Sequence, residues 1–289
     1  MSSRLDKRFP EKRIMVTGGA SGLGKALALR FAREGWKVAI ADLNTERITQ
    51  TEEELAKSGV EHMGFRCDVT QEGDLRKAAA ALKEKWGGLD ILVNNAGVAG
   101  AGMIEKITDE EWNRIIGVNF LGVVKGCRVF VPLMKEQGGG HIVNVSAVAG
   151  FASLPEMSSY NATKAAAISL SETLRVELAP YRIGVTVVCP TFIPTNLMES
   201  FTSPDERQRR VAGKFFNTST HSIESFSDRV YKAVSKGRLY AVTERDGRLI
   251  WFIKRLFPEL YYRLFAGRYS RDRDMFERHL DGKKRLPAP

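Results

Sequence analysis

Short apolar runs alternate with longer amphipathic stretches along most of the chain. Seven runs have the length and composition of strands, and they lie near residues 13–17, 37–41, 61–66, 89–93, 141–145, 183–189 and 238–242. Between them, apolar residues recur with helical periodicity. Regular alternation of this kind predicts a parallel sheet covered by helices on both faces, with ligands at the carboxyl ends of the strands. The expected fold class is α/β, a single doubly wound domain with a seven-stranded parallel sheet.

The alternating pattern ends near residue 245. We expect residues 1–245 to form the dinucleotide-binding and catalytic domain, for which a content of 43% hydrophobic residues supplies a large core. Residues 246–289 are expected to form an amphipathic, basic helical extension in which Pro258 breaks or restarts the helix. Its apolar positions recur at helical spacing and comprise Leu249, Phe252, Ile253, Leu256, Phe257, Leu260, Tyr261, Leu264 and Phe265.

A glycine-rich turn follows the first apolar run and precedes a helical stretch. Its glycines are Gly18, Gly22 and Gly24, a spacing that differs from the Gly-x-Gly-x-x-Gly of many dinucleotide-binding proteins. A turn of this kind lets backbone amides and the positive end of a helix approach a pyrophosphate. Asp42 ends the second run, about 20 residues past the glycines, where it can accept hydrogen bonds from the adenosine ribose.

The same carboxylate bears on the choice of cofactor. Asp42 would repel a 2′-phosphate, and neither Ser21 nor the two residues after Asp42 supply a compensating cation. The sequence therefore favours NAD over NADP. Lys25 and Arg47 keep NADP as the alternative.

Tyr160 and Lys164 are separated by four positions, so they share one face of a predicted helix. An ammonium beside a phenol favours the phenolate and lowers its pKa from about 10 toward the range of a general acid or base. Ser146 ends the strand predicted just upstream. Together with the glycine turn, these three side chains indicate an enzyme that transfers hydride.

At this point the sequence resembles the short-chain dehydrogenase/reductase family, which has a Rossmann fold, from about residue 12 to residue 242. The motifs that carry the resemblance are residues 17–24, the pair Asp68 and Val69, and residues 94–97. Thr191 stands where the family usually has glycine, which affects the shape of the nicotinamide pocket. The resemblance implies a set of cofactor-binding residues: Gly18, Ser21, Gly22, Leu23, Gly24, Asp42, Asp68, Val69, Asn95, Ala96, Gly97, Tyr160, Lys164, Pro190, Ile193 and Thr195.

The resemblance also implies four catalytic residues. Tyr160 would exchange a proton with the substrate oxygen while hydride passes between the substrate carbon and the nicotinamide. Lys164 would hold the nicotinamide ribose and lower the pKa of Tyr160, and Ser146 would polarise the substrate oxygen. Asn119, within a helical stretch, would help to keep a water for proton relay behind Lys164. Two alternatives stay open: an NADPH-dependent carbonyl reductase of the same family, and a non-catalytic nucleotide-binding protein.

Apolar residues on the substrate side predict a hydrophobic alcohol or carbonyl substrate rather than a sugar. The interpretation that they are merely core residues stays open. They flank Tyr160 or belong to a lid expected between Thr195 and about His221, and they are Phe151, Leu154, Met157, Leu197, Met198, Phe201, Phe215 and Phe216.

Cysteine and histidine usage argues against a metal site. Cys67, Cys127 and Cys189 are widely spaced and form no cluster with the four histidines, which also fits a reducing compartment. The amino-terminal residues lack the apolar core of a signal, and no run approaches the roughly 20 apolar residues of a spanning helix. We expect a cytoplasmic protein.

The net charge of +10 is unevenly distributed. Between Lys254 and Arg285, ten Lys/Arg accompany five Asp/Glu. One interpretation is peripheral contact of this extension with a membrane surface, and the other is a helical pair that covers the substrate cleft or a neighbouring subunit. Because no nucleic-acid-reading motif accompanies the charge, we expect no nucleic-acid partner. The family resemblance implies a homodimer or homotetramer, assembled through helices around residues 108–136 and 157–179.

Overall fold

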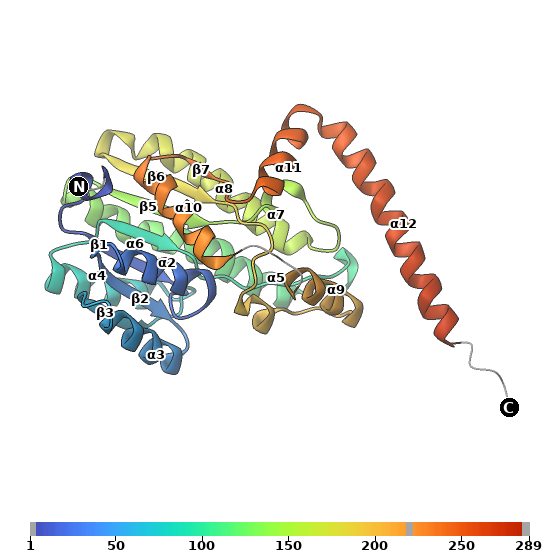
Figure 1. The fold of residues 1–289 in the computed structure, drawn as a ribbon, viewed down its shortest axis with the longest axis horizontal. Helices are drawn as coiled ribbons and strands as arrows, with labels where there is room; N and C mark the ends of the chain where they lie inside the picture. The colour runs from blue at the N-terminus through green and yellow to red at the C-terminus, as the bar shows by residue number, and fades with distance from the viewer. Residues whose placement is uncertain (1–3, 218–221, 285–289) are drawn as a thin grey trace. The chain divides into compact units, whose positions relative to one another are not determined.

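Seven parallel strands form one sheet in the computed structural model, which describes residues 4–217 and 222–284 (Figure 1). The strand order is β3-β2-β1-β4-β5-β6-β7. All seven predicted runs therefore become strands of one sheet, and the predicted α/β fold is confirmed. The strands are β1 (Arg13–Thr17), β2 (Lys37–Asp42), β3 (His62–Arg66), β4 (Ile91–Asn94), β5 (Gly140–Val145), β6 (Ile183–Val188) and β7 (Tyr240–Ala241).

The chain divides into two compact units, Met1–Gly247 and Arg248–Pro289. The first unit contains the sheet and ten α-helices among its described residues. Their bounds are α1 (Arg4–Arg8), α2 (Gly22–Ala32), α3 (Thr45–Ala56), α4 (Glu72–Trp86), α5 (Asp109–Ile116), α6 (Gly122–Glu136), α7 (Ala149–Ala152), α8 (Ser158–Glu177), α9 (Glu206–Asn217) and α10 (Ile223–Ser235). Helix α11 (Arg245–Leu256) spans the boundary between the units, and α12 (Pro258–Lys284) belongs to the second unit.

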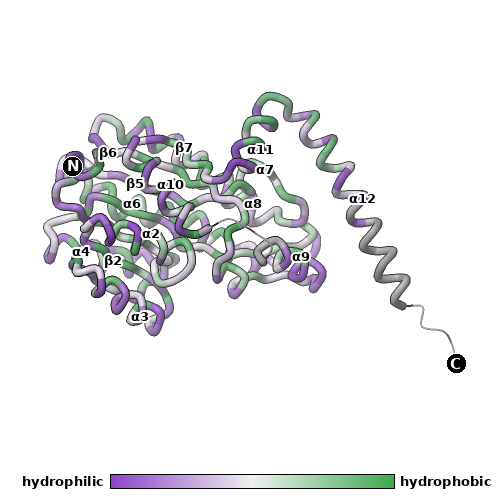
Figure 2. Tube along the Cα trace, viewed as in Figure 1, coloured by the Kyte–Doolittle hydropathy of each residue, from purple (hydrophilic) through white to green (hydrophobic). Residues whose placement is uncertain are grey.

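Two apolar layers cover the two faces of the sheet. Helices α2 and α10 contribute to one layer, and α4 and α6 contribute to the other. Successive side chains of a strand point to opposite faces, so Val16 belongs to the first layer and Met15 to the second. Because both faces are covered, most strand residues are buried and apolar, whereas β3 at the edge of the sheet is only half-buried; Figure 2 shows the hydropathy along the chain.

A buried ion pair joins β1 to the start of β4 at the amino-terminal edge of the sheet. The Arg13 guanidinium donates to both carboxylate oxygens of Asp90, at 2.8 and 3.1 Å, and the Arg13 backbone N–H donates to the same carboxylate at 2.8 Å. The carboxyl ends of the strands lie at the opposite edge. There the strand order reverses between β1 and β4, which is where open α/β sheets bind ligands.

A π-helical turn, Gly117–Leu121, joins α5 to α6. The resulting stretch Asp109–Glu136 is the one among the described helices that is long and apolar enough to cross a membrane by length and composition. Its buried side chains, including Val123 and Phe130, belong to the second apolar layer. The stretch is therefore a core helix of this fold.

The second unit is helical, and α12 begins at Pro258. A proline is well tolerated at this position, because the N–H groups of the first turn have no acceptor within the helix and the missing N–H of proline costs no hydrogen bond. Several large apolar side chains of α11 and α12 are exposed. They are Leu249, Phe252, Leu256, Phe257, Leu260, Tyr262 and Leu264.

Candidate active site

The glycine turn between β1 and α2 is so tight that side chains are excluded from it. A Cβ on Gly24 would lie 2.0 Å from the carbonyl oxygen of Gly18, and Gly18 itself has a φ of 60°. The Asn95 amide donates to the carbonyls of Thr17 and Gly18, at 3.0 Å each. Asn95 thus fixes the turn through its side chain, at the amino-terminal end of α2, where an anionic ligand is favoured.

Asp42 lies beside this turn at the end of β2. Its carboxylate accepts the backbone N–H of Ala20 and that of Asn44, both at 3.1 Å. These bonds fix the carboxylate at the edge where a ribose is expected. Arg66 is the partner of Asp42 in the β2–β3 register. The sequence interpretation missed this cation because it depends on strand register rather than on local spacing.

The segments after β3 and β4 shape the next part of the edge. The Asp68 carboxylate accepts both the N–H and the hydroxyl of Thr70, at 2.8 Å, and Val69 is buried against α6. A Cβ on Gly97 would lie 3.3 Å from Oδ1 of Asn119 and 3.5 Å from Nζ of Lys164. Glycine at this position therefore lets the chain pass close to two of the predicted catalytic residues.

Asn119 is fully buried in the π-helical turn. Its Oδ1 accepts the Val98 N–H at 2.8 Å, and its Nδ2 donates to the Val98 carbonyl at 2.9 Å. Both ends of the amide are thus used to hold the segment after β4. π-Helical turns occur often at functional sites, and this one brings Asn119 close to Gly97, which Lys164 also approaches.

Ser146, Tyr160 and Lys164 lie together, all buried, where β5 meets the start of α8. The Ser146 hydroxyl donates to the Lys164 carbonyl at 2.7 Å, and the Lys164 ammonium donates to the Val145 carbonyl at 3.1 Å. Lys164 Nζ lies 5.6 Å from the centroid of the Tyr160 ring. The structure therefore brings together three side chains that lie within a span of 18 residues, from Ser146 to Lys164.

The pKa of Tyr160 differs from the expectation. Burial raises the pKa of this phenol above its ordinary value of 10.0, whereas a lowered value was expected from the neighbouring ammonium. Burial also lowers the pKa of Lys164 from 10.5 to about 8. The physical reason is desolvation, which penalises the charged form of both groups, and the ammonium is directed at the Val145 carbonyl.

The segment after β6 approaches the glycine turn from the other side. A Cβ on Gly22 would lie 3.2 Å from Cβ of Thr195, and Ile193 is buried in the first apolar layer. The Pro190 carbonyl accepts the Val148 N–H at 2.9 Å. The predicted pyrophosphate and nicotinamide segments thus meet at the carboxyl edge.

Apolar side chains from three segments pack around Tyr160. Of the predicted substrate-side residues, five belong to this cluster: Leu154, Met157, Leu197, Met198 and Phe201. Phe151 is half-buried and lies outside the cluster. The side chains of Phe215 and Phe216, and the lid residues 218–221, lie outside the described part of the chain.

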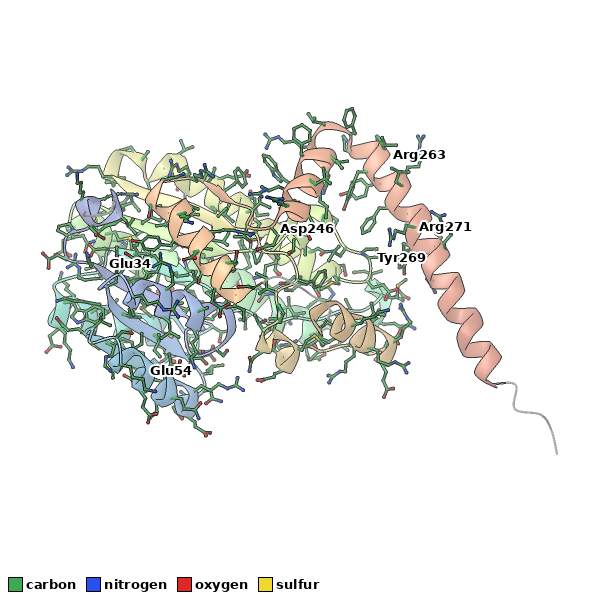
Figure 3. All side chains as sticks on the ribbon, in the orientation of Figure 1. Glu34, Glu54, Asp246, Arg263, Tyr269 and Arg271 are labelled. Atoms are coloured by element: carbon green, nitrogen blue, oxygen red, sulfur yellow. The ribbon has the colours of Figure 1, made fainter. Side chains whose placement is uncertain are left out.

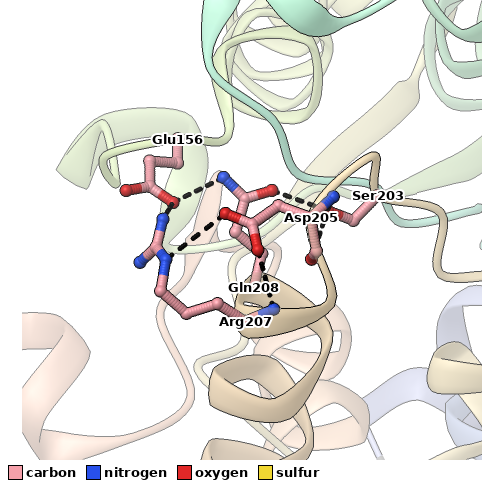
Figure 4. Close-up of polar contacts among 5 residues, drawn as sticks. All are labelled: Glu156, Ser203, Asp205, Arg207 and Gln208. Carbon is pink, nitrogen blue, oxygen red and sulfur yellow. Dashed lines mark hydrogen bonds and ion pairs between the residues drawn. The ribbon is translucent and has the colours of Figure 1, made fainter. Parts of the chain in front are cut away.

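A polar cluster joins the loop before Tyr160 to the start of α9 (Figure 4). The Glu156 carboxylate accepts hydrogen bonds from Arg207 and Gln208, and Gln208 in turn accepts the hydroxyl of Ser203. Glu156 has a φ of 59°, so these bonds hold a residue in an unfavourable backbone conformation. Sequence reasoning missed the cluster, because its members lie about 50 residues apart and carry no local signal.

Comparison with known proteins agrees with this geometry. A family model described as short chain dehydrogenase matches residues 12–206. The chain belongs to the short-chain dehydrogenase family. Its members are oxidoreductases that act on CH–OH groups with a nicotinamide dinucleotide.

Individual relatives of this family member differ in length and in name. "Probable oxidoreductase EphD" from Mycobacterium tuberculosis is 33% identical over 260 residues, which cover 87% of this chain and 44% of that protein. The chain thus spans less than half the length of EphD. A 3beta-hydroxysteroid dehydrogenase from Mediterraneibacter gnavus is 37% identical over 193 residues, covering 66% of this chain and 70% of that protein.

A solved structure of a short-chain dehydrogenase/reductase from Burkholderia phymatum, in complex with NAD, is similar to this chain with a TM-score of 0.81. The two chains are 30% identical, and the match covers 86% of this chain and 94% of the other. Among the described residues, no three His, Cys, Asp or Glu side chains form a group that could hold a metal ion.

The buried ammonium of Lys164 should reduce the stability of the fold. Because its pKa falls from 10.5 to about 8 on folding, the unfolded chain binds more protons between these values, so wild-type stability rises with pH across that window. At pH 7, Lys164→Met should increase the free energy of unfolding by about 2 kcal/mol. This figure is the gain from removing the buried charge, reduced by the loss of the hydrogen bond to the Val145 carbonyl. The gain should shrink between pH 8 and pH 10.5.

Urea unfolding midpoints at pH 7, 9 and 10.5 measure this effect. Lys85→Met, on the exposed face of α4, is the matched control and should show no comparable pH dependence. A Lys164→Met variant that is less stable than wild type at every pH would contradict the interpretation.

Proposed function

We propose that this dehydrogenase transfers hydride between NAD(H) and a hydrophobic alcohol or carbonyl compound, with Tyr160 as the general acid and base. The observation that carries the proposal is the buried group of Ser146, Tyr160 and Lys164 beside the glycine turn, at the carboxyl edge of the sheet. A non-catalytic nucleotide-binding protein would have no use for these three side chains together.

Each side chain has a role that its contacts permit. Tyr160 takes the alcohol proton at its phenolic oxygen during oxidation and returns it during reduction. The Ser146 hydroxyl is directed at the Lys164 carbonyl, and it can turn to donate to the substrate oxygen and polarise it. A bound nicotinamide supplies the site that accepts or donates hydride.

Lys164 and Asn119 support this chemistry. The ammonium has three N–H donors and uses one on the Val145 carbonyl, which leaves donors for the hydroxyls of a ribose. Burial raises the pKa of the Tyr160 phenol, so this side chain is protonated before the reaction and serves as the proton donor during reduction. Asn119 holds the segment after β4 beside Lys164, and we assign the relay water to this side of the ammonium.

The charges around Asp42 favour NAD. Two cations kept NADP as an alternative. One of them, Lys25, forms an ion pair of 2.7 Å with Glu54. Glu54 projects from α3 (Figure 3). Arg47 is paired with Glu199 at 2.9 Å. Cations engaged in ion pairs are less available to a 2′-phosphate, and the Burkholderia phymatum structure holds NAD. Arg66, beside Asp42 in the register, keeps an NADPH-dependent carbonyl reductase as the runner-up.

A hydrophobic substrate is supported by the apolar cluster around Tyr160. Leu154 and Met157, from the loop before α8, and Phe201, from the segment after β6, belong to the same apolar cluster as Tyr160. Apolar side chains beside the reacting oxygen favour a bulky secondary alcohol or its ketone over a polyol, whose hydroxyls would be left unpaired there. The likeness to a 3beta-hydroxysteroid dehydrogenase agrees with this substrate class.

Assembly as a homo-oligomer fits the family. Leu121 in the π-helical turn and Val176 near the end of α8 are exposed apolar residues on the two helical stretches expected to form the interface. A second copy packed there would remove them from water.

The exposed apolar residues of α11 and α12 suit an anionic membrane surface. Between Arg248 and Arg268 there are five Lys/Arg and one Glu, interleaved with aromatic residues, and Arg263 and Arg271 project from α12 (Figure 3). Basic and aromatic side chains around an apolar stripe are typical of helices that lie at a lipid interface. A second copy would bring the same positive excess, so charge complementarity favours lipid over self-association through this extension.

Tyr160→Phe should reduce turnover at least about a hundredfold, because the proton donor is lost, while the dissociation constant for NAD+ stays within about threefold of wild type. Absorbance of the reduced nicotinamide, followed over a panel of lipophilic secondary alcohols, ketones and polyols, measures the first quantity. Tyr181→Phe, at an exposed tyrosine, is the matched control. Retained activity in Tyr160→Phe would refute the catalytic role, and turnover of polyols alone would refute the substrate class.

Asp42→Ser should increase kcat/KM for NADP+ by about tenfold and decrease it for NAD+, because the carboxylate that repels a 2′-phosphate is removed. When Arg66→Gln is added to Asp42→Ser, kcat/KM for NADP+ should fall part of the way back to the wild-type value, and the kinetics with NAD+ should not change further. Steady-state kinetics with both cofactors provide the measurement. A wild-type enzyme that prefers NADP+ would contradict the assignment.

The full chain should sediment with vesicles that contain an anionic phospholipid at low salt and less so at high salt, and it should not sediment with phosphatidylcholine alone. Phe252→Ser combined with Leu256→Ser should abolish sedimentation, whereas Val176→Ser should not. Absence of sedimentation at either salt concentration would refute membrane contact. Loss of self-association in the double variant, without lipid binding in the wild type, would assign the stripe to a second copy.

A further inference from the structure

The Glu244 carboxylate is buried next to the segment that follows β6. One of its oxygens, Oε2, accepts the backbone N–H of Thr191 at 3.1 Å and also accepts the hydroxyl of Thr243. The other, Oε1, lies 3.9 Å from the guanidinium of Arg229, which itself donates to the Thr243 carbonyl at 2.5 Å. Only 2% of Glu244 is exposed. Burial of a carboxylate is costly, so these partners show that its position is tightly determined.

The other side of the same loop is held by the segment that carries Ser146. The Val148 N–H, two residues after Ser146, donates to the Pro190 carbonyl at 2.9 Å. Pro190 and Thr191 therefore lie between two fixed anchors, Val148 and Glu244. The loop is connected on one side to the candidate catalytic serine and on the other to the end of the first unit.

Thr191 occupies the position where the family usually has glycine, and the structure accommodates its side chain. A Cβ on Gly247 would lie 3.0 Å from Cγ2 of Thr191 and 2.8 Å from Cγ2 of Val148. Gly247 therefore leaves the space that the larger residue at position 191 needs. A threonine packed in this way has fewer conformations than a glycine, which makes the loop stiffer.

We propose that Glu244 is a positioning residue that fixes the Pro190–Thr191 loop and, through it, the nicotinamide half of bound NAD. The proposal rests on the proposed function, in which this loop lies beside the nicotinamide. A loop held in its binding conformation loses little entropy when the ligand arrives, so removal of the anchor weakens binding of the part of the ligand that the loop contacts. The adenosine half lies against other segments and is not affected.

Affinities for NAD+ and for ADP-ribose, which lacks the nicotinamide, separate this role from general destabilisation. In Glu244→Met, no acceptor remains for the Thr191 N–H, and we expect the dissociation constant for NAD+ to rise about tenfold while that for ADP-ribose changes less than about twofold. Glu244→Gln keeps an amide oxygen for the same N–H and should stay within about threefold of wild type for both ligands. Isothermal titration calorimetry of the full chain gives both constants.

Two further variants complete the test. Glu244→Asp keeps a carboxylate but shortens the side chain, so this variant should fold and still weaken the binding of NAD+ selectively. It serves as the test if the methionine variant does not fold. Asp90→Asn removes a buried carboxylate at the opposite edge of the sheet and should lower the melting temperature without changing the ratio of the two affinities. Equal weakening of NAD+ and ADP-ribose by the Glu244 variants, or no weakening, would overturn the proposal. A wild-type chain that binds neither ligand would instead refute the proposed function.

Discussion

The candidate site depends on the absence of side chains at the end of β1. With only 2.0 Å between the Gly18 carbonyl oxygen and the place where a Cβ on Gly24 would stand, α2 begins directly at the strand end. Because α2 starts close to the strand end, its positive amino-terminal end lies at the same edge as the carboxyl ends of β4, β5 and β6. Every other part of the site is arranged around this close approach.

Buried and half-buried polar side chains that bond to the backbone give the site its rigidity. Asn95 holds the glycine turn, Asn119 holds the segment after β4, Lys164 is directed at the end of β5, and Glu244 holds the loop after β6. Each polar group loses water on burial and recovers only part of the loss through its hydrogen bonds. The fold thus accepts a cost in stability at this edge, as is common where side chains must keep one orientation.

Much of this arrangement could be predicted from local sequence patterns. Strands covered on both faces read as continuous apolar runs, and the positions of Ser146, Tyr160 and Lys164 follow from strand ends and helical spacing. What the patterns could not supply depends on distant contacts. Three such contacts arise only when the chain is folded: the Glu156 cluster, the hydrogen bond from Thr191 to Glu244, and the pairing of Arg66 with Asp42 in the strand register. The raised pKa of Tyr160 belongs to the same group, because helical spacing shows which charge is near but not how much water is lost.

At Gly247, the last residue of the first unit, an added Cβ would clash with Thr191 and Val148. The root of the carboxyl-terminal extension is therefore part of the wall behind the loop after β6, although the extension itself forms a separate unit. Position 247 therefore has to stay without a side chain, because a larger residue there would displace Thr191 or Val148 and so disturb the loop after β6 from behind.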